Sequence, residues 1–380
     1  MRKLFFIKKR FSLHGGAENY MKTLVDQLKL DYDITILSTH WDPAEGINFN
    51  YIPSSQITSF LSLTTFNRNV CKAVKNNAPD CTISFDRTLC QDIYRAGEGC
   101  HAEWLAIRSK REAFYKKISF KINPLHLCLL SMEKRLFSDT SCIIANSRMV
   151  KANIIKHYGV PAEKIHLLYN GVDLDRFTPG NREKWRKHVR NKLALRNDAN
   201  LVLFVGSGFR RKGLQVLLEA VPLIRDKEMK VLVIGKGPVD KSKALADRYG
   251  IADKIIFMGT QKEIEKYYAA ADLFVLPTLY DPFSNATLEA MASGIPVVTT
   301  GNNGAAELIE NGKEGFIVND MFDAQELATY IDAALCGAHR MGEAARRKAV
   351  GGAIENTASA FSEIINRVLN LKKSNSREIF

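Results

Sequence analysis

The sequence predicts an α/β protein made of two Rossmann-like, doubly wound domains that face each other across a cleft. Three observations lead to this prediction. The chain of 380 residues is too long for one ordinary core and suits two domains. Short apolar runs alternate with helical patterns almost throughout, which is typical of parallel sheets covered on both faces. The alternation occurs in two sets, separated by the loop-rich stretch 167–180.

The first set predicts strands at Lys3–Lys8, Ile34–Ser38, Cys81–Phe85 and Ser141–Ala145, with helices at Ala17–Leu28 and Arg148–His157. The second set predicts strands at Leu201–Gly206, Lys230–Gly235, Lys254–Gly259, Asp272–Pro277 and Pro296–Thr300. Its helices are expected at Leu214–Ile224, Lys241–Tyr249, Glu263–Ala269, Asn285–Ser293 and Asp323–Leu335. We therefore expect an N-terminal domain over 1–168 and a C-terminal domain over 169–354. The helical tail, 355–380, is expected to pack back onto the first domain.

Composition and cysteine spacing suggest where the protein works. With 46% hydrophobic and 25% charged residues, the chain is typical of a globular protein. The N-terminal apolar run Leu4–Ile7 is too short for a signal-peptide core, and no run approaches the length of a membrane-spanning helix. Seven scattered cysteines without a CxxC pair suggest reduced thiols. We therefore expect a cytoplasmic protein.

The net charge of +13 predicts an acidic partner, which could be nucleic acid, an anionic membrane surface or a phosphorylated small molecule. Between His101 and Phe137, eight cations stand against three anions, with aromatic and aliphatic residues interleaved. This composition predicts a basic helix lying in a membrane interface; the alternative is a solvated helix face packed on its own domain. The residues expected to contact the membrane are Trp104, Arg108, Lys110, Arg111, Lys116, Lys117 and Lys121.

Two glycine-containing segments follow predicted strands, where doubly wound sheets bind their ligands. In HGGAENY, Gly15 and Gly16 would let the backbone approach a bulky group beside a helix N-terminus, although an ordinary turn explains them too. In VGSGFRRKG, the cations Arg210, Arg211 and Lys212 follow a strand. Adjacent cations repel one another unless an anion is near, so this segment predicts phosphate binding, with a solvated loop as the alternative. Its spacing fits neither a P-loop nor GxGxxG.

Two carboxylates mark a third segment, DPFSNATLEAMASGIPVV, which runs from Asp281 to Val298. Asn285 is predicted to cap a helix that carries Glu289 on its inner side. Asp281 and Glu289 would accept hydrogen bonds from the hydroxyls of a sugar ligand; the alternative is a buried Glu held by backbone donors. A fourth segment, RAGEGCHAEW, places His101 after a strand. A single histidine is more often structural than catalytic, but its position opposite the cations of the second domain favours a functional role.

Taken together, these segments resemble glycosyltransferase family 4, the retaining group with the GT-B fold. The resemblance spans nearly the whole chain, and the block 269–298 is its most specific part. The matching motifs are GGAE (15–18), GEGCH (97–101), ANS (145–147), NGVDLDRF (170–177), FRRKG (209–213), NNGAAELI (302–309) and NGKEGFIV (311–318). Within the family, VGSGFRRKG, the RAGEGCH segment and the basic stretch after it are similar to the lipopolysaccharide core glucosyltransferases, peripheral enzymes of the cytoplasmic face of the inner membrane.

The resemblance implies that the N-terminal domain, 1–168, binds the acceptor and that the C-terminal domain, 169–354, binds the nucleotide sugar. It also implies a role for individual residues. Gly15 and Gly16 would border the phosphates and sugar of the donor, Arg211 and Lys212 would hold its diphosphate, and His101 would face the reacting bond. Asp281 would contact the sugar hydroxyls and Glu289 the ribose, at the positions of the family's paired acids. The other residues implied in donor binding are Pro282, Phe283, Ser284 and Asn285 at the sugar, and Gln261 and Ile264 beside the nucleobase. His101, Lys212 and Asp281 are the expected catalytic residues.

The sequence departs from the family pattern at two positions. Asp281 replaces the usual Glu, and Ser207 stands where many members carry an Arg. Asp173 and Asp175 resemble the metal-binding DxD of other glycosyltransferases, but in this family the tripeptide belongs to an interdomain loop. We therefore expect neither a metal nor a cofactor, the nucleotide sugar being a substrate.

The resemblance implies a retaining transfer of a hexose, glucose from UDP-glucose, to a membrane-associated glycolipid of the lipopolysaccharide core or another cell-surface glycan. Three alternatives stay open. The acceptor could be a polyprenyl-linked glycan or a capsular polysaccharide, or the chain could bind a nucleotide sugar without turning it over. A nucleic-acid-binding protein would also explain the charge, but a phosphate-binding loop beside two acids argues against it.

Overall fold

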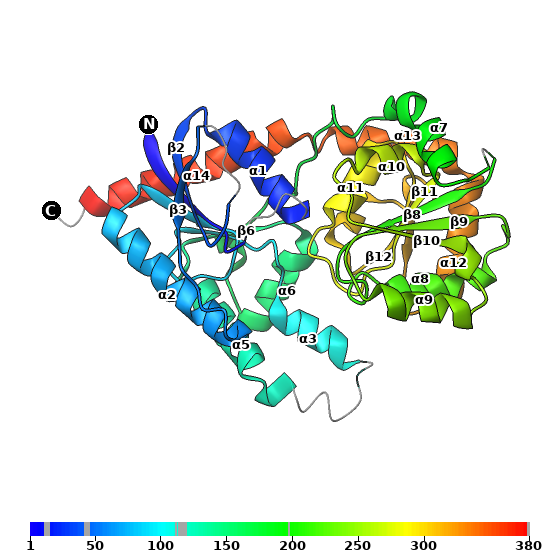
Figure 1. Cartoon of the computed structure of the whole chain (residues 1–380). Coiled ribbons are helices and arrows are strands. Elements are labelled where there is room, and N and C mark those ends of the chain that lie inside the picture. Colours follow the sequence, from blue (N-terminus) through cyan, green and yellow to red (C-terminus); the bar gives the residue numbers. More distant parts are fainter. Residues whose placement is uncertain (11–15, 42–45, 111, 113–119, 197, 378–380) are drawn as a thin grey trace. The chain divides into compact units, whose positions relative to one another are not determined.

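The structure, a computed structural model, describes residues 1–10, 16–41, 46–110, 112, 120–196 and 198–377. The chain forms two compact units (Figure 1). Unit 1 comprises Met1–Tyr169 and Glu355–Phe380, and unit 2 comprises Asn170–Ile354. Each unit is built around one parallel sheet with helices packed against it, so the predicted fold class is confirmed.

The sheet of unit 1 has seven strands in the order β3-β2-β1-β4-β5-β6-β7, and every pairing recorded between them is parallel. Its strands are β1 (Arg2–Ile7), β2 (Tyr32–Ser38), β3 (Asn48–Tyr51), β4 (Cys81–Ser84), β5 (Ile93–Arg95), β6 (Cys142–Ala145) and β7 (Ile165–Leu167). The chain builds outward from β1 to β3 and then crosses back to β4. The strand order therefore reverses between β1 and β4, whose carboxyl ends form the topological switch point where such sheets bind ligands.

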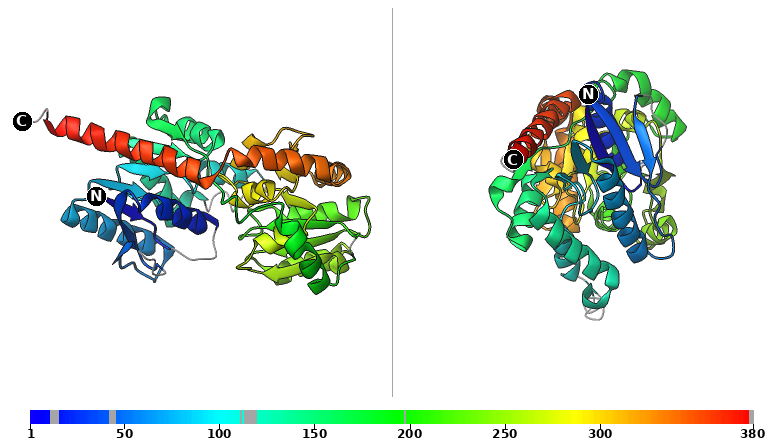
Figure 2. Two further views of the ribbon diagram at one scale, coloured as in Figure 1. Left: turned by 90° about the horizontal axis from the view of Figure 1, so that it is seen from above. Right: turned by 90° about the vertical axis from the view of Figure 1, so that its left-hand side faces the viewer.

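The helices described in unit 1 are α1 (Gly16–Leu28), α2 (Ser59–Asn77), α3 (His101–Ser109), α5 (Pro124–Asp139), α6 (Arg148–Tyr158), the 3-10 turn η1 (Ala162–Lys164) and α14 (Ile354–Arg377). Figure 2 shows α14 running along unit 1. Phe361 stacks on Phe85 with ring centroids 6.3 Å apart, and the Lys372 ammonium lies 3.0 Å from a carboxylate oxygen of Asp92. These contacts join the C-terminal helix to the sheet of unit 1.

Unit 2 has six parallel strands in the order β10-β9-β8-β11-β12-β13. They are β8 (Leu201–Val205), β9 (Lys230–Ile234), β10 (Ile255–Gly259), β11 (Leu273–Leu276), β12 (Val297–Thr300) and β13 (Gly315–Val318). The helices are α7 (Asn181–Lys192), α8 (Leu214–Ala220), η2 (Val221–Leu223), α9 (Val239–Arg248), η3 (Ala252–Lys254), α10 (Glu265–Ala270), α11 (Asn285–Ala292), η4 (Gly304–Leu308), α12 (Ala324–Cys336) and α13 (Ala338–Val350). Here the strand order reverses between β8 and β11.

The basic stretch 101–137 corrects one prediction. Its described residues include the separate helices α3 and α5 rather than one continuous helix. Asn123 caps α5, its side chain accepting a hydrogen bond from the Leu125 N–H, and Pro124 occupies the first helical turn. An Asn cap followed by Pro in the first turn is typical of a helix start, so α5 begins here as a separate helix. Leu105 and Phe120 are also buried, so part of the apolar sequence packs inside unit 1.

The cysteines correct a second expectation. Cys71 on α2 and Cys90 in the loop before β5 form a disulfide, with their Cα atoms 5.4 Å apart. The expectation of seven reduced thiols is therefore wrong for this pair. The two cysteines lie 19 residues apart in the sequence. This spacing does not indicate that helix α2 and the loop before β5 pack together. Cysteine content thus no longer argues for a reducing compartment.

Candidate functional site

The phosphate-binding segment and the acidic segment of the sequence meet at the switch point of unit 2. The loop after β8 contains Arg211, and its carbonyl oxygen accepts hydrogen bonds from the Leu279 N–H at 2.8 Å and the Thr278 hydroxyl at 2.9 Å, both in the loop after β11. Gly213 has a φ of +76°, and a Cβ there would lie 1.8 Å from the Pro277 carbonyl oxygen. Only glycine allows this approach, so Gly213 lets the two loops join.

Lys212 and Asp281 form an ion pair at the centre of this site. Their side chains are only 12% and 8% exposed. The Lys212 stem lies along Gly206, where an added Cβ would come within 3.0 Å of the Lys212 Cγ. Burial lowers the pKa of Lys212, and the Asp281 carboxylate opposes this effect. Asp281 therefore helps to keep a buried lysine charged.

Arg211 completes the cationic group. One guanidinium nitrogen donates to the Tyr280 carbonyl oxygen at 3.0 Å and lies 4.0 Å from an Asp281 carboxylate oxygen. Hydrogen bonds from the Asp281 N–H to the Asn302 carbonyl and from the Gly304 N–H to the Asp281 carbonyl, each 2.9 Å, fix the acid's backbone. Asp281 therefore pairs directly with Lys212 and lies beside Arg211, a direct contact that the sequence alone did not indicate.

Glu289 lies on α11, and its partner is a tyrosine rather than backbone donors. The Tyr268 hydroxyl lies 2.9 Å from a Glu289 carboxylate oxygen and 3.1 Å from the Ala286 carbonyl oxygen. Burial raises the pKa of Glu289, and the Tyr268 hydrogen bond works against that rise. A half-buried carboxylate with one side-chain donor keeps acceptor capacity for a ligand hydroxyl.

The helix cap differs from the prediction. Ser284 caps α11 by accepting a hydrogen bond from the Thr287 N–H, and Asn285 is the first helical residue. The Asn285 side-chain oxygen instead accepts a 2.5 Å hydrogen bond from the Asn170 side chain. Asn285 therefore ties the segment 170–177 to the start of α11.

Other predicted donor-binding residues lie elsewhere in the two units or outside the described residues. The Gln261 side chain donates to the Met258 carbonyl oxygen at 2.7 Å and accepts from the Tyr267 hydroxyl at 2.8 Å, so its amide is used within its own loop. Ile264 precedes α10, and Phe283 is buried. Gly16 begins α1, and Gly15 lies outside the described residues.

In unit 1, His101 begins α3 and is held by a buried carboxylate. Its backbone N–H donates to both oxygens of Glu133, at 2.8 and 3.0 Å. Its ring Nε2 lies 3.0 Å from Nδ1 of His126. Burial, with the Arg87 charge adding to it, lowers the pKa of His101 to about 4, so the imidazole is neutral at pH 7.

Sequence reasoning missed the group that organises His101. The Glu133 side chain is fully buried; besides the His101 N–H, it accepts a 2.8 Å hydrogen bond from Arg87 and another from the Tyr158 hydroxyl. In the sequence, Glu133 is an acid among apolar residues, in LLSMEKRLF, which is typical of a buried carboxylate. From the sequence alone it was treated only as one of the three anions of the basic stretch. Glu133 therefore positions the start of α3.

The pKa of His101 leads to a testable expectation. In the range from pH 6.5 to about 4, the unfolded chain binds a proton at this position and the folded protein does not, so folding stability falls as the pH is lowered through this window. We expect the His101 ring resonances, assigned with a His101→Gln variant, to stay constant from pH 8 to about pH 5 in an NMR titration. A midpoint near 6.5 would contradict the described environment.

The predicted membrane-contact residues fall into three groups. Arg108 lies over the rings of Trp104 and Phe120, 5.8 and 4.5 Å from their centroids, and pairs with Glu112 at 3.3 Å. Lys110 and Lys121 are exposed. Arg111, Lys116 and Lys117 lie outside the described residues.

The described residues contain no cluster of three or more His, Cys, Asp or Glu arranged to hold a metal. The Asp173 carboxylate accepts hydrogen bonds from the backbone N–H groups of Asp175 and Arg176, at 3.1 and 2.9 Å, which shapes a turn. Among the same residues, no helix is long and apolar enough to cross a membrane.

Comparison with known proteins gives consistent matches over both units. Residues 14–176 match the family model described as Glycosyltransferase Family 4, and residues 186–348 match the one described as Glycosyl transferases group 1. The lipopolysaccharide glucosyltransferase WaaG of Escherichia coli is 23% identical over 87% of this chain and 88% of its own length. An uncharacterized glycosyltransferase of Methanocaldococcus jannaschii is 30% identical, over 47% of each chain.

Solved structures agree with these matches. The crystal structure of WaaG superposes with a TM-score of 0.83 at 22% identity, covering 95% of this chain and 99% of that one. The Anabaena protein HepE in complex with UDP-glucose gives a TM-score of 0.74 at 19% identity, covering 97% and 100%. At these identities the likeness establishes the fold.

Proposed function

Because the chain belongs to the family 4 glycosyltransferases with the GT-B fold, we propose that it moves glucose from UDP-glucose to a membrane-associated glycolipid with retention of anomeric configuration. The observation that carries the proposal is the Lys212, Arg211 and Asp281 group at the switch point of unit 2. The donor assignment is supported by the name of WaaG, a glucosyltransferase, and by the UDP-glucose bound to HepE. The acceptor is proposed to belong to the lipopolysaccharide core or another cell-surface glycan.

The proposed reaction takes place on one face of the sugar. The bond between the anomeric carbon and the diphosphate oxygen breaks, the acceptor oxygen bonds to the same face, and the departing diphosphate takes the acceptor proton. Negative charge grows on the β-phosphate as the bond breaks. Lys212 and Arg211 would stabilise this charge more in the transition state than in the ground state, which is the condition for catalysis.

Asp281 and Glu289 have separate roles in this proposal. Asp281 keeps Lys212 charged and accepts a hydrogen bond from a sugar hydroxyl, while Glu289 accepts from the ribose. Neutral His101 takes the role that the family resemblance implies, beside the donor sugar. A neutral imidazole both donates and accepts hydrogen bonds, which suits contact with a sugar hydroxyl.

Nucleotide binding tests the proposal. We expect UDP-sugars to raise the melting temperature above GDP- and ADP-sugars, because a ligand that binds the native state stabilises it. The Glu289→Gln variant should bind UDP about tenfold or more weakly in calorimetry, since it loses a hydrogen bond to a charged acceptor. Glu228→Gln, an exposed acid of unit 2 outside the site, is the matched control. An unchanged affinity in Glu289→Gln would remove the ribose assignment.

We further propose that the enzyme is peripheral, on the cytoplasmic face of the inner membrane, and that the start of α5 contacts anionic lipid. Beside the exposed Lys121, Ile122 and Leu127 are 69% and 49% exposed. Cations next to exposed apolar side chains are typical of an interfacial segment.

Flotation with vesicles tests the membrane contact. The protein should float with vesicles containing phosphatidylglycerol more than with neutral ones, and a Lys110→Gln, Lys121→Gln double variant should float less because each cation adds attraction to an anionic surface. A Lys241→Gln, Lys243→Gln variant on α9 removes the same charge from unit 2 and should behave as wild type. Equal flotation with neutral and anionic vesicles would exclude the proposal.

A further inference from the structure

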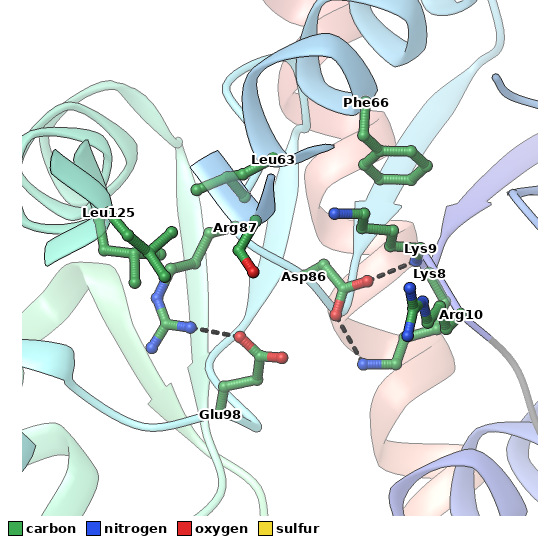
Figure 3. Close-up of a pocket in the computed structure, with 11 residues that line it drawn as sticks. Lys8, Lys9, Arg10, Leu63, Phe66, Asp86, Arg87, Glu98 and Leu125 are labelled. Atoms are coloured by element: carbon green, nitrogen blue, oxygen red, sulfur yellow. Dashed lines mark hydrogen bonds and ion pairs between the residues drawn. The ribbon is translucent and has the colours of Figure 1, made fainter. Parts of the chain in front are cut away.

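Unit 1 contains a cavity of about 350 Å³ that the donor assignment does not use (Figure 3). It lies at the switch point of this sheet, where Lys8, Lys9 and Arg10 follow β1 and Asp86 and Arg87 follow β4. Its volume falls at the lower end of the range for small-molecule sites. The cavity is therefore in the position that the fold uses for ligands.

The charge of the cavity is predominantly positive. Lys8, Lys9, Arg10 and Arg87 line it, against the two acids Asp86 and Glu98. Figure 3 shows the three cations from the end of β1 together on one side, with Leu125 of α5 on the opposite side. A pocket with this charge favours an anionic ligand.

The acids of the cavity are already engaged by some of these cations. One Asp86 oxygen accepts from the Lys8 ammonium at 2.6 Å, and the other accepts from the Lys9 backbone N–H. Glu98 pairs with Arg87. The Lys9 and Arg10 side chains have no carboxylate partner among the described residues.

Lys9 is placed beside an aromatic ring instead of an acid. Its ammonium lies 5.9 Å from the centroid of the Phe66 ring. Burial, followed by the neighbouring Arg10 charge, lowers the pKa of Lys9. The Asp86 and Glu98 carboxylates oppose this shift in part, and a bound anion would add to their effect because it brings further negative charge close to Lys9.

Apart from Ser59, the remaining wall of the cavity is apolar. Leu63 and Phe66 come from α2, and Leu125 and Leu129 come from α5. Side chains of this kind pack against an alkyl chain or the apolar face of a sugar ring. The cavity thus combines cations at one side with an apolar surface at the other.

We propose that this cavity binds the acceptor substrate through a phosphate group held by Lys9 and Arg10, with an apolar part of the acceptor against α2 and α5. Its assignment to the acceptor rests on the proposed transferase function; the binding of a phosphate-bearing amphiphile does not. Arg holds phosphate oxygens with two parallel hydrogen bonds and Lys adds a mobile charge, so the pair suits a phosphate ester. The phosphate belongs either to a lipid carrier or to a phosphorylated sugar of the acceptor.

Calorimetry on the full chain, with saturating UDP present to fill the donor site, tests the proposal with three probes. Decyl phosphate represents a lipid phosphate, glucose 6-phosphate represents a phosphorylated sugar, and decyl β-D-glucoside is the neutral amphiphile. We expect at least one phosphate probe to bind tighter than the glucoside. Whichever phosphate binds tighter identifies the source of the group.

The matched variants are Lys9→Gln, Arg10→Gln and, as control, Lys72→Gln, an exposed residue of α2 outside the cavity. The first two should weaken phosphate binding about tenfold or more, as expected for losing a charged contact, and the control should not. Arg10 is exposed, so its replacement does not threaten folding. Unchanged phosphate affinity in both variants, or equal binding of the glucoside, would overturn the proposal.

UDP affinity, measured in parallel, separates this inference from the proposed function. If UDP binds and neither phosphate probe does, the cavity assignment fails while the donor site stands. If phosphate probes bind with the expected variant pattern and UDP does not, the donor assignment fails while the anion site stands.

Discussion

Replacing Lys212 with alanine is expected to lower kcat for sugar transfer by on the order of 10²–10³, the effect of removing one preorganised donor to a developing negative charge. The variant leaves the Asp281 carboxylate, 8% exposed, beside the departing diphosphate without its lysine partner. The loss of the lysine charge and the unpaired Asp281 carboxylate both disfavour the negative charge that develops on the β-phosphate. The measurement is steady-state release of UDP from the donor with acceptor present.

Two matched variants complete this experiment. Lys241→Ala removes an exposed lysine of α9 in the same unit and should keep full turnover. Lys212→Arg keeps the charge and should retain more activity than the alanine variant, although the longer side chain does not reproduce the contact along Gly206. Turnover of Lys212→Ala near that of wild type would exclude a catalytic role for this lysine.

Replacing Glu133 with alanine is expected to destabilise unit 1 by about 3–5 kcal/mol, the cost of leaving one partner of a buried ion pair unpaired. Glu133 is fully buried, and its removal would leave the Arg87 guanidinium, the Tyr158 hydroxyl and the His101 N–H without this acceptor. Urea unfolding followed by the fluorescence of Trp41 and Trp104 reports on unit 1; replacing Trp185 with phenylalanine in all proteins removes the signal of unit 2.

The control for Glu133 is Glu163→Ala, which removes an exposed acid of unit 1 and should change stability by only a few tenths of a kcal/mol. Hydrogen exchange gives a second measurement. Amides at the start of α3 should exchange faster in Glu133→Ala, because that carboxylate accepts the His101 N–H. An unchanged unfolding midpoint and unchanged protection would show that Glu133 does not hold α3.

The fold was predictable because its central strands are continuous apolar runs. LVLFV in β8 and LFVL in β11 are buried on both faces and were expected as strands. Strands β5 and β7 have three residues each, too few for a periodic pattern. Helix α2 was not predicted because its sequence, SFLSLTTFNRNVCKAVKNN, contains few strong helix formers. The helix forms because burial of Phe66 and Val70 in the core outweighs this weak helix propensity.

The site was predictable only in part, since a sequence orders residues but does not bring loops together. Lys212 and Asp281 were each singled out from their own segment, yet their direct pairing depends on Gly213 packing against the Pro277 carbonyl. The Tyr268 partner of Glu289 and the His126 partner of His101 come from other helices. Neither Tyr268 nor His126 belongs to a recognisable sequence motif, so only the three-dimensional structure shows these contacts.

The central claim is that the donor diphosphate binds to the Lys212 and Arg211 pair at the β8–β11 switch point. A crystal structure of the chain with UDP tests it directly. The account predicts β-phosphate oxygens at about 2.7–2.9 Å from the Lys212 Nζ and the Arg211 guanidinium. A diphosphate bound out of reach of both side chains would contradict it.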